Sequence, residues 1–385
     1  MHENQVKEKY SSPHDMAVEY HSFLAPTGYT QAAIDNIRAM ESVDIKVSLR
    51  CVHGKMVGSG FSTSERKWLS SLTLKDYGSN AVQMLHAIPP RWSNIKLRDN
   101  RIAIFVFENT KIPDLWIDML SKCRGVIVPS MFNYNSLKEI GHKNVFLVNH
   151  AVDLRIWNTD ISTPRIDENK HIRIITVGTW RQRKNWKQML LAIVSAQESV
   201  NNIHWTIKVD RGAAAIKDIQ KWLEEVGKSH LFDKYIKVDS RILDEYSMAR
   251  LVSSHDLLLS ASLGEGFGLP ALQACFVGLP VVCPMYGGYT EFFDPDCYYE
   301  IKCSGFAKVP KMDSLPQFDN LEWPIYEKDS ILDALYSCIG NLEKSKNLAH
   351  VVARRGVKKF NHKTIGMSFI NVLNTCNAIS SDKNP

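Results

Sequence analysis

Residues 264–284 read GEGFGLPALQACFVGLPVVCP, an apolar stretch with one carboxylate, Glu265, between two glycines. The preceding letters DLLLS (256–260) predict a buried strand, and the proline at 270 suits the first position of a helix. Strand, glycine loop, helix and strand in turn are the repeating unit of a parallel α/β sheet. Ligands of such sheets bind beyond the carboxyl ends of the strands. Glu265 is therefore expected at the mouth of a binding site, with Gln273 facing the same site from the helix.

The same alternation of short β-rich runs and longer amphipathic segments extends through the chain. The predicted strands are 45–49, 102–107, 125–128, 145–148, 172–177, 205–209, 235–238, 256–259, 280–283 and 298–301. With 385 residues the chain is longer than one ordinary core requires, so two α/β domains are expected. The polar segment 157–170 (WNTDISTPRIDENK) is the predicted boundary, and a final helix is predicted over 362–378.

Composition indicates an ordinary globular protein, with 44% hydrophobic and 23% charged residues. The opening MHENQVKEKYSSPHD lacks the apolar core of a signal peptide, and no run reaches the roughly 18 apolar residues of a membrane span. A cytoplasmic location is therefore predicted. The eight cysteines show no metal-binding spacing, which predicts reduced thiols and no zinc site, with Cys275 and Cys283 in the core. The net charge of +6 is compatible with weak association with an anionic surface.

Two further loops at predicted strand ends carry polar residues of the kind that bind phosphorylated ligands. The letters PMYGGYTEFF (284–293) place paired glycines before Thr290, a turn that suits an anion. The letters VGTWRQRKNW (177–186) place Arg181, Arg183 and Lys184 directly after a strand. Each feature alone is also explained by solvation or by the helix dipole. Together, an acid for hydroxyls and cations for phosphates favour a nucleotide sugar as the ligand.

These motifs resemble those of the retaining GT-B glycosyltransferases of family 4, the group 1 glycosyl transferases. The letters GEGFGLPALQACFVGLPVV resemble the family's E-G-F-G-L-P-x-x-E-A-x-A-x-G-x-P-V-V, its most specific motif. The segments VGTWRQRKN, GGYTEFF and VDSRILDEYSMARLVSSHDLLLSAS resemble its diphosphate, glycine and nucleobase segments. In the first half, PTGYTQAAIDNIRAM, FENTKIPDLWIDMLSKCRGVIVPSMFNYNSL and VNHAVD resemble further family segments. The resemblance extends from about Pro26 to Leu373.

The resemblance implies a fold of two Rossmann-like parallel α/β domains facing each other across a cleft. The implied domains are 1–160, which binds the acceptor, and 161–360, which binds the nucleotide sugar. Residues 361–385 would form a C-terminal helix that crosses back to the N-terminal domain and a frayed tail. The implied reaction transfers a sugar from a nucleotide-diphosphate sugar to an acceptor hydroxyl, with retention of the anomeric configuration. No cofactor and no metal are expected.

Catalytic roles are implied for Glu265, Lys184 and Arg183. Glu265 would bind the hydroxyls of the transferred sugar, while Lys184 and an arginine would bind the diphosphate. Because Thr179 stands where the family often has that arginine, Arg181 or Arg183 would replace it. The other predicted donor-binding residues are Gly28, Arg241, Ile242, Gly266, Phe267, Gly268, Leu269, Gln273 and Thr290. The predicted acceptor-side residues are Gln31, His53, Glu108 and His150.

Two departures from the family pattern affect these expectations. Gln273 replaces the family's second glutamate, whose usual role is to accept hydrogen bonds from the donor ribose. An amide oxygen accepts such a bond without charge assistance, which costs about 1 kcal/mol. Ala151 in VNHAVD stands where the family prefers glycine, so the acceptor side is less well defined than the donor side.

Three functions remain open on the sequence alone. The acceptor of a transferase would be a glycan, a glycolipid or a small molecule. Alternatively, the acceptor is a hydroxymethylated DNA base, which is favoured only by the 18 Lys and Arg against 14 Asp and Glu in residues 1–150. A non-catalytic protein that binds sugar nucleotides is the third reading, and Gln273 is its one argument.

Overall fold

The computed structural model describes residues 15–52, 60–109, 111–161, 171–294, 297–309 and 321–381. The described chain divides into two compact units. The first unit contains the residues up to Phe107, then Lys111–Asp153, and finally the chain from Lys358 onward. The second unit contains Glu108–Thr110 and Leu154–Val357. Each unit is built on a parallel sheet of six strands, so the GT-B fold expected from the sequence is confirmed.

The sheet of the first unit has the strand order β2-β1-β3-β4-β5-β6. Its strands are β1 (Ala17–Ser22), β2 (Lys46–Cys51), β3 (Val82–His86), β4 (Ile102–Ile104), β5 (Gly125–Val128) and β6 (Val145–Leu147). Its helices are α1 (Gly28–Glu41), α2 (Thr63–Thr73), α3 (Asp114–Ser121), α4 (Met131–Glu139) and α12 (His362–Ser381). Every strand pairing is parallel, because each strand is followed by a helical or looped crossover before the next.

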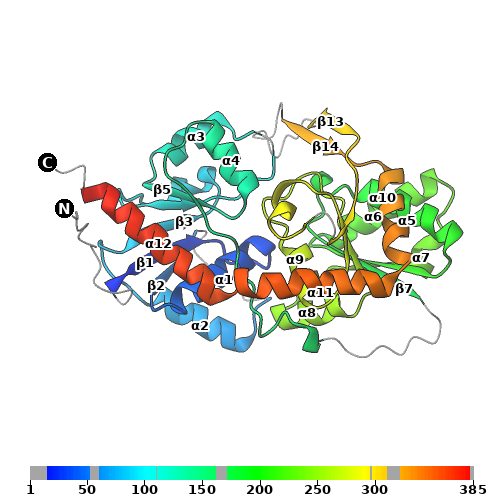
Figure 1. Cartoon of the computed structure of the whole chain (residues 1–385), viewed down its shortest axis with the longest axis horizontal. Coiled ribbons are helices and arrows are strands. Elements are labelled where there is room, and N and C mark those ends of the chain that lie inside the picture. Colours follow the sequence, from blue (N-terminus) through cyan, green and yellow to red (C-terminus); the bar gives the residue numbers. More distant parts are fainter. Residues whose placement is uncertain are drawn as a thin grey trace, which may run out of the picture. The chain divides into compact units, whose positions relative to one another are not determined.

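The sheet of the second unit has the strand order β12-β11-β10-β7-β8-β9 and is again parallel. Its strands are β7 (Ile172–Val177), β8 (Ile203–Lys208), β9 (Ile236–Asp239), β10 (Leu257–Leu259), β11 (Val281–Cys283) and β12 (Tyr299–Glu300). Its helices are α5 (Trp186–Ser199), α6 (Gly212–Glu225), α7 (Leu231–Tyr235), α8 (Glu245–Ser253), α9 (Leu269–Phe276) and α10 (Lys328–Ile339). A separate antiparallel pair, β13 (Gly305–Lys308) and β14 (Glu322–Ile325), precedes α10 (Figure 1).

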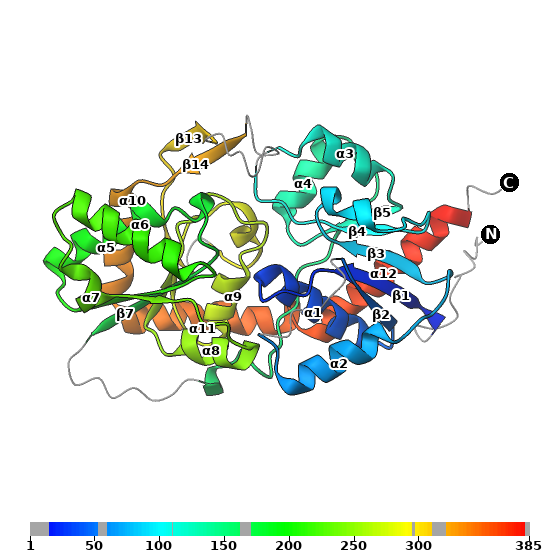
Figure 2. The same ribbon diagram turned by 180° about the vertical axis from the view of Figure 1, so that it is seen from behind.

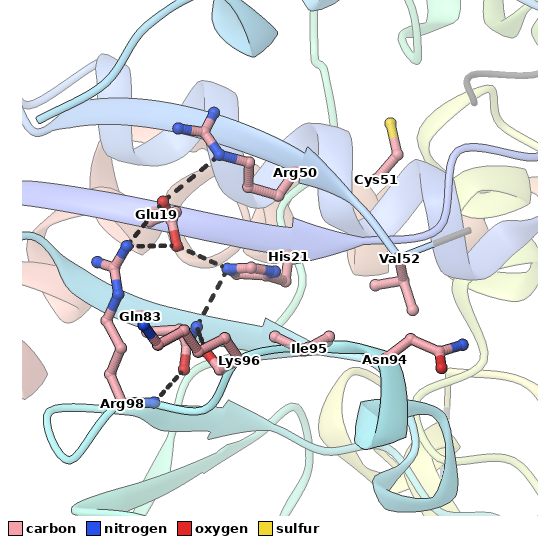
Figure 3. A pocket seen from close by; sticks show the side chains of 10 residues that line it. All are labelled: Glu19, His21, Arg50, Cys51, Val52, Gln83, Asn94, Ile95, Lys96 and Arg98. Carbon is pink, nitrogen blue, oxygen red and sulfur yellow. Dashed lines mark hydrogen bonds and ion pairs between the residues drawn. The ribbon is translucent and has the colours of Figure 1, made fainter. Parts of the chain in front are cut away.

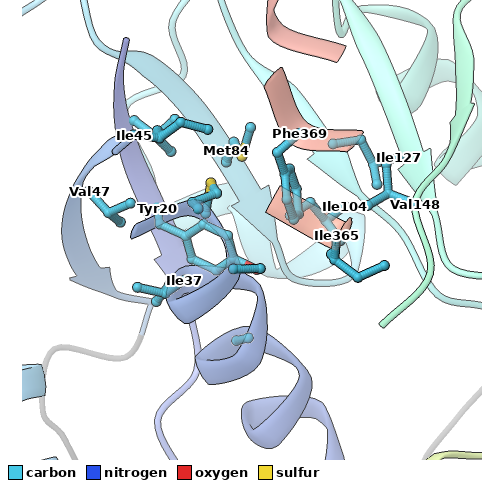
Figure 4. Close-up of a cluster of buried hydrophobic side chains, with 14 of the residues drawn as sticks. Tyr20, Ile37, Ile45, Val47, Met84, Ile104, Ile127, Val148, Ile365 and Phe369 are labelled. Carbon is cyan, nitrogen blue, oxygen red and sulfur yellow. The ribbon is translucent and has the colours of Figure 1, made fainter. Parts of the chain in front are cut away.

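The last helix completes the core of the first unit. Helix α11 (Leu342–Lys359) brings the chain back from the second unit, and α12 packs along α1 in both views (Figures 1 and 2). Ile365 and Phe369 of α12 lie in one buried cluster with Tyr20 of β1 and Ile37 of α1 (Figure 4). Gly366 allows the two helices to approach closely: a Cβ added there would lie 2.3 Å from the carbonyl oxygen of Ala39.

Most of the predicted elements are confirmed, with ends that differ by one or two residues. The predicted strand 102–107 is too long, since β4 ends at Ile104. Beyond it, Phe105 N still donates to Ile127 O of β5 at 2.8 Å, but Phe107 N donates to the side chain of Asn133. The sequence analysis missed β1 and β3, whose letters AVEYHS and VQMLH include charged or polar residues. Cys275 and Cys283 are buried as predicted.

The chain passes into the second unit slightly before the predicted boundary segment. It leaves the first unit after Asp153, whereas the boundary was placed at 157–170, of which 162–170 lie outside the described residues. Trp157 already belongs to the second unit, where its indole Nε1 donates to Glu245 Oε1 at 2.9 Å. Among the described residues, no helix has the length and apolar character that crossing a membrane requires.

Candidate functional site

The candidate site lies where the strand order of the second sheet reverses. Strands β7 and β10 are neighbours, with β8 and β9 on one side and β11 and β12 on the other. The loops that follow β7 and β10 therefore start side by side at the carboxyl edge of the sheet. This position is the usual ligand site of an open α/β sheet. The two loops contain the predicted cations, Arg183 and Lys184, and the predicted acid, Glu265.

Backbone hydrogen bonds join these loops to each other and to the loop after β11. Leu263 N donates to Arg183 O at 2.8 Å, and Gly288 N donates to Glu265 O at 2.7 Å. The first loop ends at Asn185, whose left-handed backbone (φ 58°) turns the chain into α5. The three loops that the sequence suggested separately thus form one connected structure around Glu265.

Glu265 is held by two cations. Lys184 Nζ donates to Glu265 Oε1, and Arg183 Nη1 lies 3.6 Å from the same oxygen. The side chains of Lys184 and Glu265 are 12% and 11% exposed, so the pair is mostly buried and keeps a small contact with solvent. An ion pair at this depth is stable only when both partners are well coordinated.

Arg183 has further partners that fix its position. Its Nη2 donates to Glu108 Oε1 at 3.0 Å, and its Nη1 donates to Ser262 Oγ at 3.3 Å and to Gly264 O. Glu108 belongs to the second unit, within the short segment Glu108–Thr110. The sequence analysis proposed Glu108 for the acceptor side, but the structure joins it to a residue of the predicted phosphate loop.

Burial and charge act in opposite directions on the three ionisable groups. Burial alone would raise the pKa of Glu265, but the nearby Lys184 and Arg183 cations lower it. For Lys184 burial dominates and lowers the pKa, against the attraction of Glu265. Burial would also lower the pKa of Arg183, yet the Glu108 and Glu265 carboxylates raise it. Glu265 is thus an ionised carboxylate at neutral pH.

Glycines allow the three loops to approach this closely. A Cβ on Gly264 would lie 1.9 Å from Glu108 O, and a Cβ on Gly288 would lie 2.1 Å from Phe267 Cα. Gly287 (φ 67°) and Gly268 (φ 87°) also adopt left-handed backbone conformations, and a Cβ on Gly287 would meet Glu265 O at 2.5 Å. The paired glycines of the sequence therefore serve close backbone packing at Glu265 and Phe267.

The other predicted donor-binding residues of the second unit follow the same sheet edge. Gly268 precedes α9, whose first residue is Leu269, and Gln273 lies one turn into this helix with 8% of its surface exposed. The Gln273 amide makes no hydrogen bond to any residue that the structure describes. Thr290 is exposed, and its hydroxyl donates to Gly287 O at 2.9 Å. Gly266, Phe267 and Leu269 are buried.

Three predicted residues are more exposed. Arg181 lies at the surface of the loop after β7. Arg241, which follows β9, is 66% exposed, and its Nη2 donates to the buried Asp239 Oδ2 at 2.6 Å. Ile242 beside it is 54% exposed.

The remaining predicted residues belong to the first unit. Gly28 is the exposed first residue of α1, and nothing lies within 4 Å of a Cβ added there. Gln31 Nε2 donates to Asp35 Oδ2 at 3.0 Å. His150 is buried, and burial lowers its pKa to about 4. His53 lies outside the described residues.

Sequence reasoning missed two residues that support the site. Ser262 donates to Gly264 O at 3.0 Å and accepts from Arg183, so it orders the loop before Glu265. Tyr289 is buried, its hydroxyl is 2.7 Å from Ser260 Oγ, and its ring packs where a Gly268 Cβ would be. Both residues lie within segments that the sequence analysis recognised, GGYTEFF for Tyr289 and the stretch that ends in LLLSAS for Ser262.

Part of the second unit matches a known protein family. Residues 159–311, which include Arg183, Lys184, Glu265 and both glycine loops, match the family described as glycosyl transferases group 1. Together with the GT-B fold, this match supports membership of the GT-B glycosyltransferase superfamily. No curated protein matches the chain.

Solved structures share the fold at low sequence identity. A glycosyltransferase from Rickettsia africae is 12% identical with a TM-score of 0.67, covering 98% of this chain and 100% of its own. Sucrose-phosphate synthase from Thermosynechococcus elongatus is 12% identical with a TM-score of 0.66, covering 94% and 100%. HepE from Anabaena, in complex with UDP and glucose, is 13% identical with a TM-score of 0.63, covering 94% and 100%.

Proposed function

We propose that this protein transfers a sugar from a nucleoside-diphosphate sugar to an acceptor hydroxyl, with retention of the anomeric configuration and without a metal. The observation that carries the proposal is the cluster of Lys184, Arg183 and Glu265 at the reversal point of the second sheet. It combines fixed cations with an ionised carboxylate at the place where such sheets bind ligands. The match of residues 159–311 to a glycosyltransferase family supports the same reaction.

The cations suit the charge that develops on a leaving diphosphate. Sugar transfer leaves a nucleoside diphosphate, and prearranged cations stabilise the transition state in which that charge forms. Lys184 and Arg183 already have their places, held by Glu265, Glu108 and Ser262. Arg181, exposed on the same loop, would supply a further contact to phosphate. These groups would take the part that a divalent cation plays in metal-dependent transferases.

Glu265 would accept hydrogen bonds from hydroxyls of the transferred sugar. Its lowered pKa keeps it ionised, and its ion pair with Lys184 holds the carboxylate in one orientation. The positive end of the α9 dipole lies just beyond it and would attract phosphate oxygens. We assign Gln273 to the ribose, and Arg241 and Ile242 to the base. Gly28, Gln31 and His150 remain candidates on the first unit, and the acceptor would be a glycan, a glycolipid or a small molecule.

A donor screen tests the proposal. Thermal unfolding is measured with UDP-, GDP-, ADP- and dTDP-sugars, beginning with UDP-glucose because HepE was solved with UDP and glucose. One nucleotide class should stabilise the protein by about 2.7 kcal/mol at a hundredfold excess over its Kd. No stabilisation by any of them would overturn the assignment of the site.

Glu265→Gln then separates binding from turnover. The substitution keeps the size of the side chain but removes the charge, so slow hydrolysis of the donor should fall by about 10²-fold or more while binding of the free nucleotide persists. NMR of the released sugar reports its anomeric configuration. Unchanged turnover would mean that Glu265 does not contact the sugar, and inversion would contradict the proposed stereochemistry.

A further inference from the structure

A second candidate site lies in the first unit, on the face of the sheet that does not pack against α1. Strand β1 directs Val18 and Tyr20 into the core, while Glu19 and His21 occupy the other face. The parallel register places Gln83 of β3 beside Glu19. Parallel sheets are usually apolar on both faces. Charged residues on β1, an interior strand, are therefore a departure that packing alone does not explain.

These residues form one network around the carboxylate of Glu19 (Figure 3). The carboxylate accepts from His21 Nε2 at 2.9 Å and from Arg98 Nη2 at 3.0 Å, and it lies 3.4 Å from Arg50 Nε. Only 9% of the Glu19 side chain is exposed. Both guanidinium groups pair with this carboxylate, and Arg50 Nη2 also lies 4.0 Å from Oδ1 of the exposed Asp76.

The cations of the network are fixed by backbone carbonyls. Arg50 Nη1 donates to Leu49 O at 3.2 Å and to Lys75 O at 3.1 Å. Arg98 Nη1 lies 3.4 Å from the carbonyl oxygens of Gly78 and Ala81. Because these side chains already have one position, an anion that binds them does not have to order them first.

A cavity of about 280 Å³ lies against this network. Among the described residues that line it, Arg50, Arg98 and Lys96 are cationic and Glu19 is anionic. Lys96 lies on the loop that follows β3, and its side chain is exposed. The cavity is slightly smaller than the usual small-molecule site. The charged residues of its lining sum to an excess of two positive charges, which matches a phosphate dianion.

His21 adds a hydrogen-bond acceptor to this cationic cavity. Its Nε2 lies 2.9 Å from Glu19 Oε1 and 3.3 Å from Gln83 Nε2. Because the contact with the Glu19 carboxylate is the shorter one and a carboxylate only accepts, Nε2 is assigned as the N–H, which leaves a lone pair on Nδ1. Nδ1 makes no hydrogen bond to a residue that the structure describes, and Figure 3 shows it on the opposite side of the ring from Glu19. Burial lowers the pKa of His21, although Glu19 opposes this effect, so the ring is neutral at pH 7.

We propose that this cavity binds a small phosphate monoester that also has a hydroxyl group. Arg50, Arg98 and Lys96 bind the phosphate, and His21 Nδ1 accepts a hydrogen bond from the hydroxyl. The described residues that line this cavity do not include Glu265, Lys184 or Arg183. It does not depend on the proposed transferase reaction.

Calorimetry on the full chain at low ionic strength tests this proposal, with glucose 6-phosphate, inorganic phosphate and glucose as probes. Glucose 6-phosphate should bind, inorganic phosphate should bind more weakly, and glucose should give no heat. Lys96→Gln should weaken the binding of both anions by about tenfold, the usual effect of losing one charged contact. Lys67→Gln, which removes an exposed lysine of α2 outside the cavity, should leave the affinities unchanged.

His21→Gln tests the hydroxyl contact separately. It should lower the affinity for glucose 6-phosphate while that for inorganic phosphate stays the same, a difference that a merely unfolded cavity would not produce. Equal effects of Lys96→Gln and Lys67→Gln would overturn the proposal, as would no binding of glucose 6-phosphate. Competition between glucose 6-phosphate and free UDP would also overturn it, because the anion would then occupy the site in the second unit.

Discussion

The arrangement around Glu265 depends on a few side chains with opposed charges. Lys184 and Arg183 share one carboxylate oxygen of Glu265, and Arg183 also binds Glu108. Sequence reasoning identified Glu265 and Lys184 because their motif is specific. It did not connect Glu108 with Arg183, because the two residues are 75 positions apart and only the folded chain brings them into contact.

Lys184 can be tested against a matched lysine of the same segment. Lys184→Gln removes a cation that the proposed diphosphate would contact, so the Kd for the nucleotide should rise by about 10- to 100-fold, equivalent to roughly 1.5–3 kcal/mol. Lys187→Gln is the control, since Lys187 is half-exposed and pairs with Glu225 at 2.8 Å. Titration calorimetry with the nucleotide from the donor screen compares the two variants. Equal affinities would mean that Lys184 does not bind the diphosphate.

At the scale of elements, the loops after β7, β10 and β11 pack together as one structure, because glycines allow their backbones to come into contact. Gly288 packs on Phe267, and Gly287 packs on the carbonyl of Glu265. The sequence suggested that the paired glycines before Thr290 form a turn that suits an anion. In the structure, Gly264, Gly287 and Gly288 have the prior role of allowing the three loops to pack together.

Gly288→Ala tests that role. The new Cβ would overlap Phe267 Cα, so the loops must shift, at a cost of about 1–3 kcal/mol in the free energy of unfolding. Nucleotide-induced stabilisation should be lost as well, because Glu265 would move with the loop. Thermal unfolding with and without nucleotide measures both effects.

Gly28→Ala is the control for a glycine with open space around it. Its stability should be unchanged or higher by up to about 1 kcal/mol, because alanine favours a helix and meets no atom. If Gly28 contacts the donor as proposed, turnover should still fall. A Gly288→Ala protein with normal stability and normal nucleotide binding would contradict the packing role of the glycine loops.

There is a physical reason why the sequence analysis missed strands β1 and β3. Strands β1 and β3 contain Glu19, His21 and Gln83 on one face, so they lack the continuous apolar run by which the other strands were recognised. The property that concealed these strands is the same one that forms the charged cavity of the first unit. A polar residue in a sheet interior is thus a signal for function as much as an argument against a strand.

At the scale of the whole molecule, the chain from Lys358 onward returns to the first unit. Helix α12 contributes Ile365 and Phe369 to the core of the first unit, more than 300 residues after the strand that contains Tyr20. The first unit is therefore incomplete until the last segment has been synthesised. Its folding depends on contacts that are distant in sequence, which favours slow assembly.

Acid should destabilise the first unit in particular. Burial lowers the pKa values of four described histidines of this unit, His21, His86, His142 and His150. For His150 the folded pKa is about 4, below an unfolded value near 6.5. The unfolded state therefore binds the proton first, so the contribution to stability is present above pH 6.5 and is lost as the pH falls towards 4.

The expected size for His150 alone is about 2 kcal/mol between pH 7 and pH 5. Urea unfolding at the two pH values measures it, and His150→Gln should reduce the loss by that amount. His230→Gln, at an exposed histidine of the second unit, is the control variant. An identical acid dependence of His150→Gln and the unmodified protein would show that His150 is not buried as a neutral ring.

The sequence by itself determined the α/β class, the positions of most strands and the motif around Glu265. These features depend on local patterns of apolar residues, glycines and prolines, which can be recognised within short stretches of sequence. Only the tertiary structure decided that Glu108 binds Arg183, that α12 completes the first core, and that Glu19, His21, Arg50 and Arg98 surround one cavity. Such contacts join residues far apart in the chain, and they exist because parallel strands bring distant side chains onto the same face and edge of a sheet.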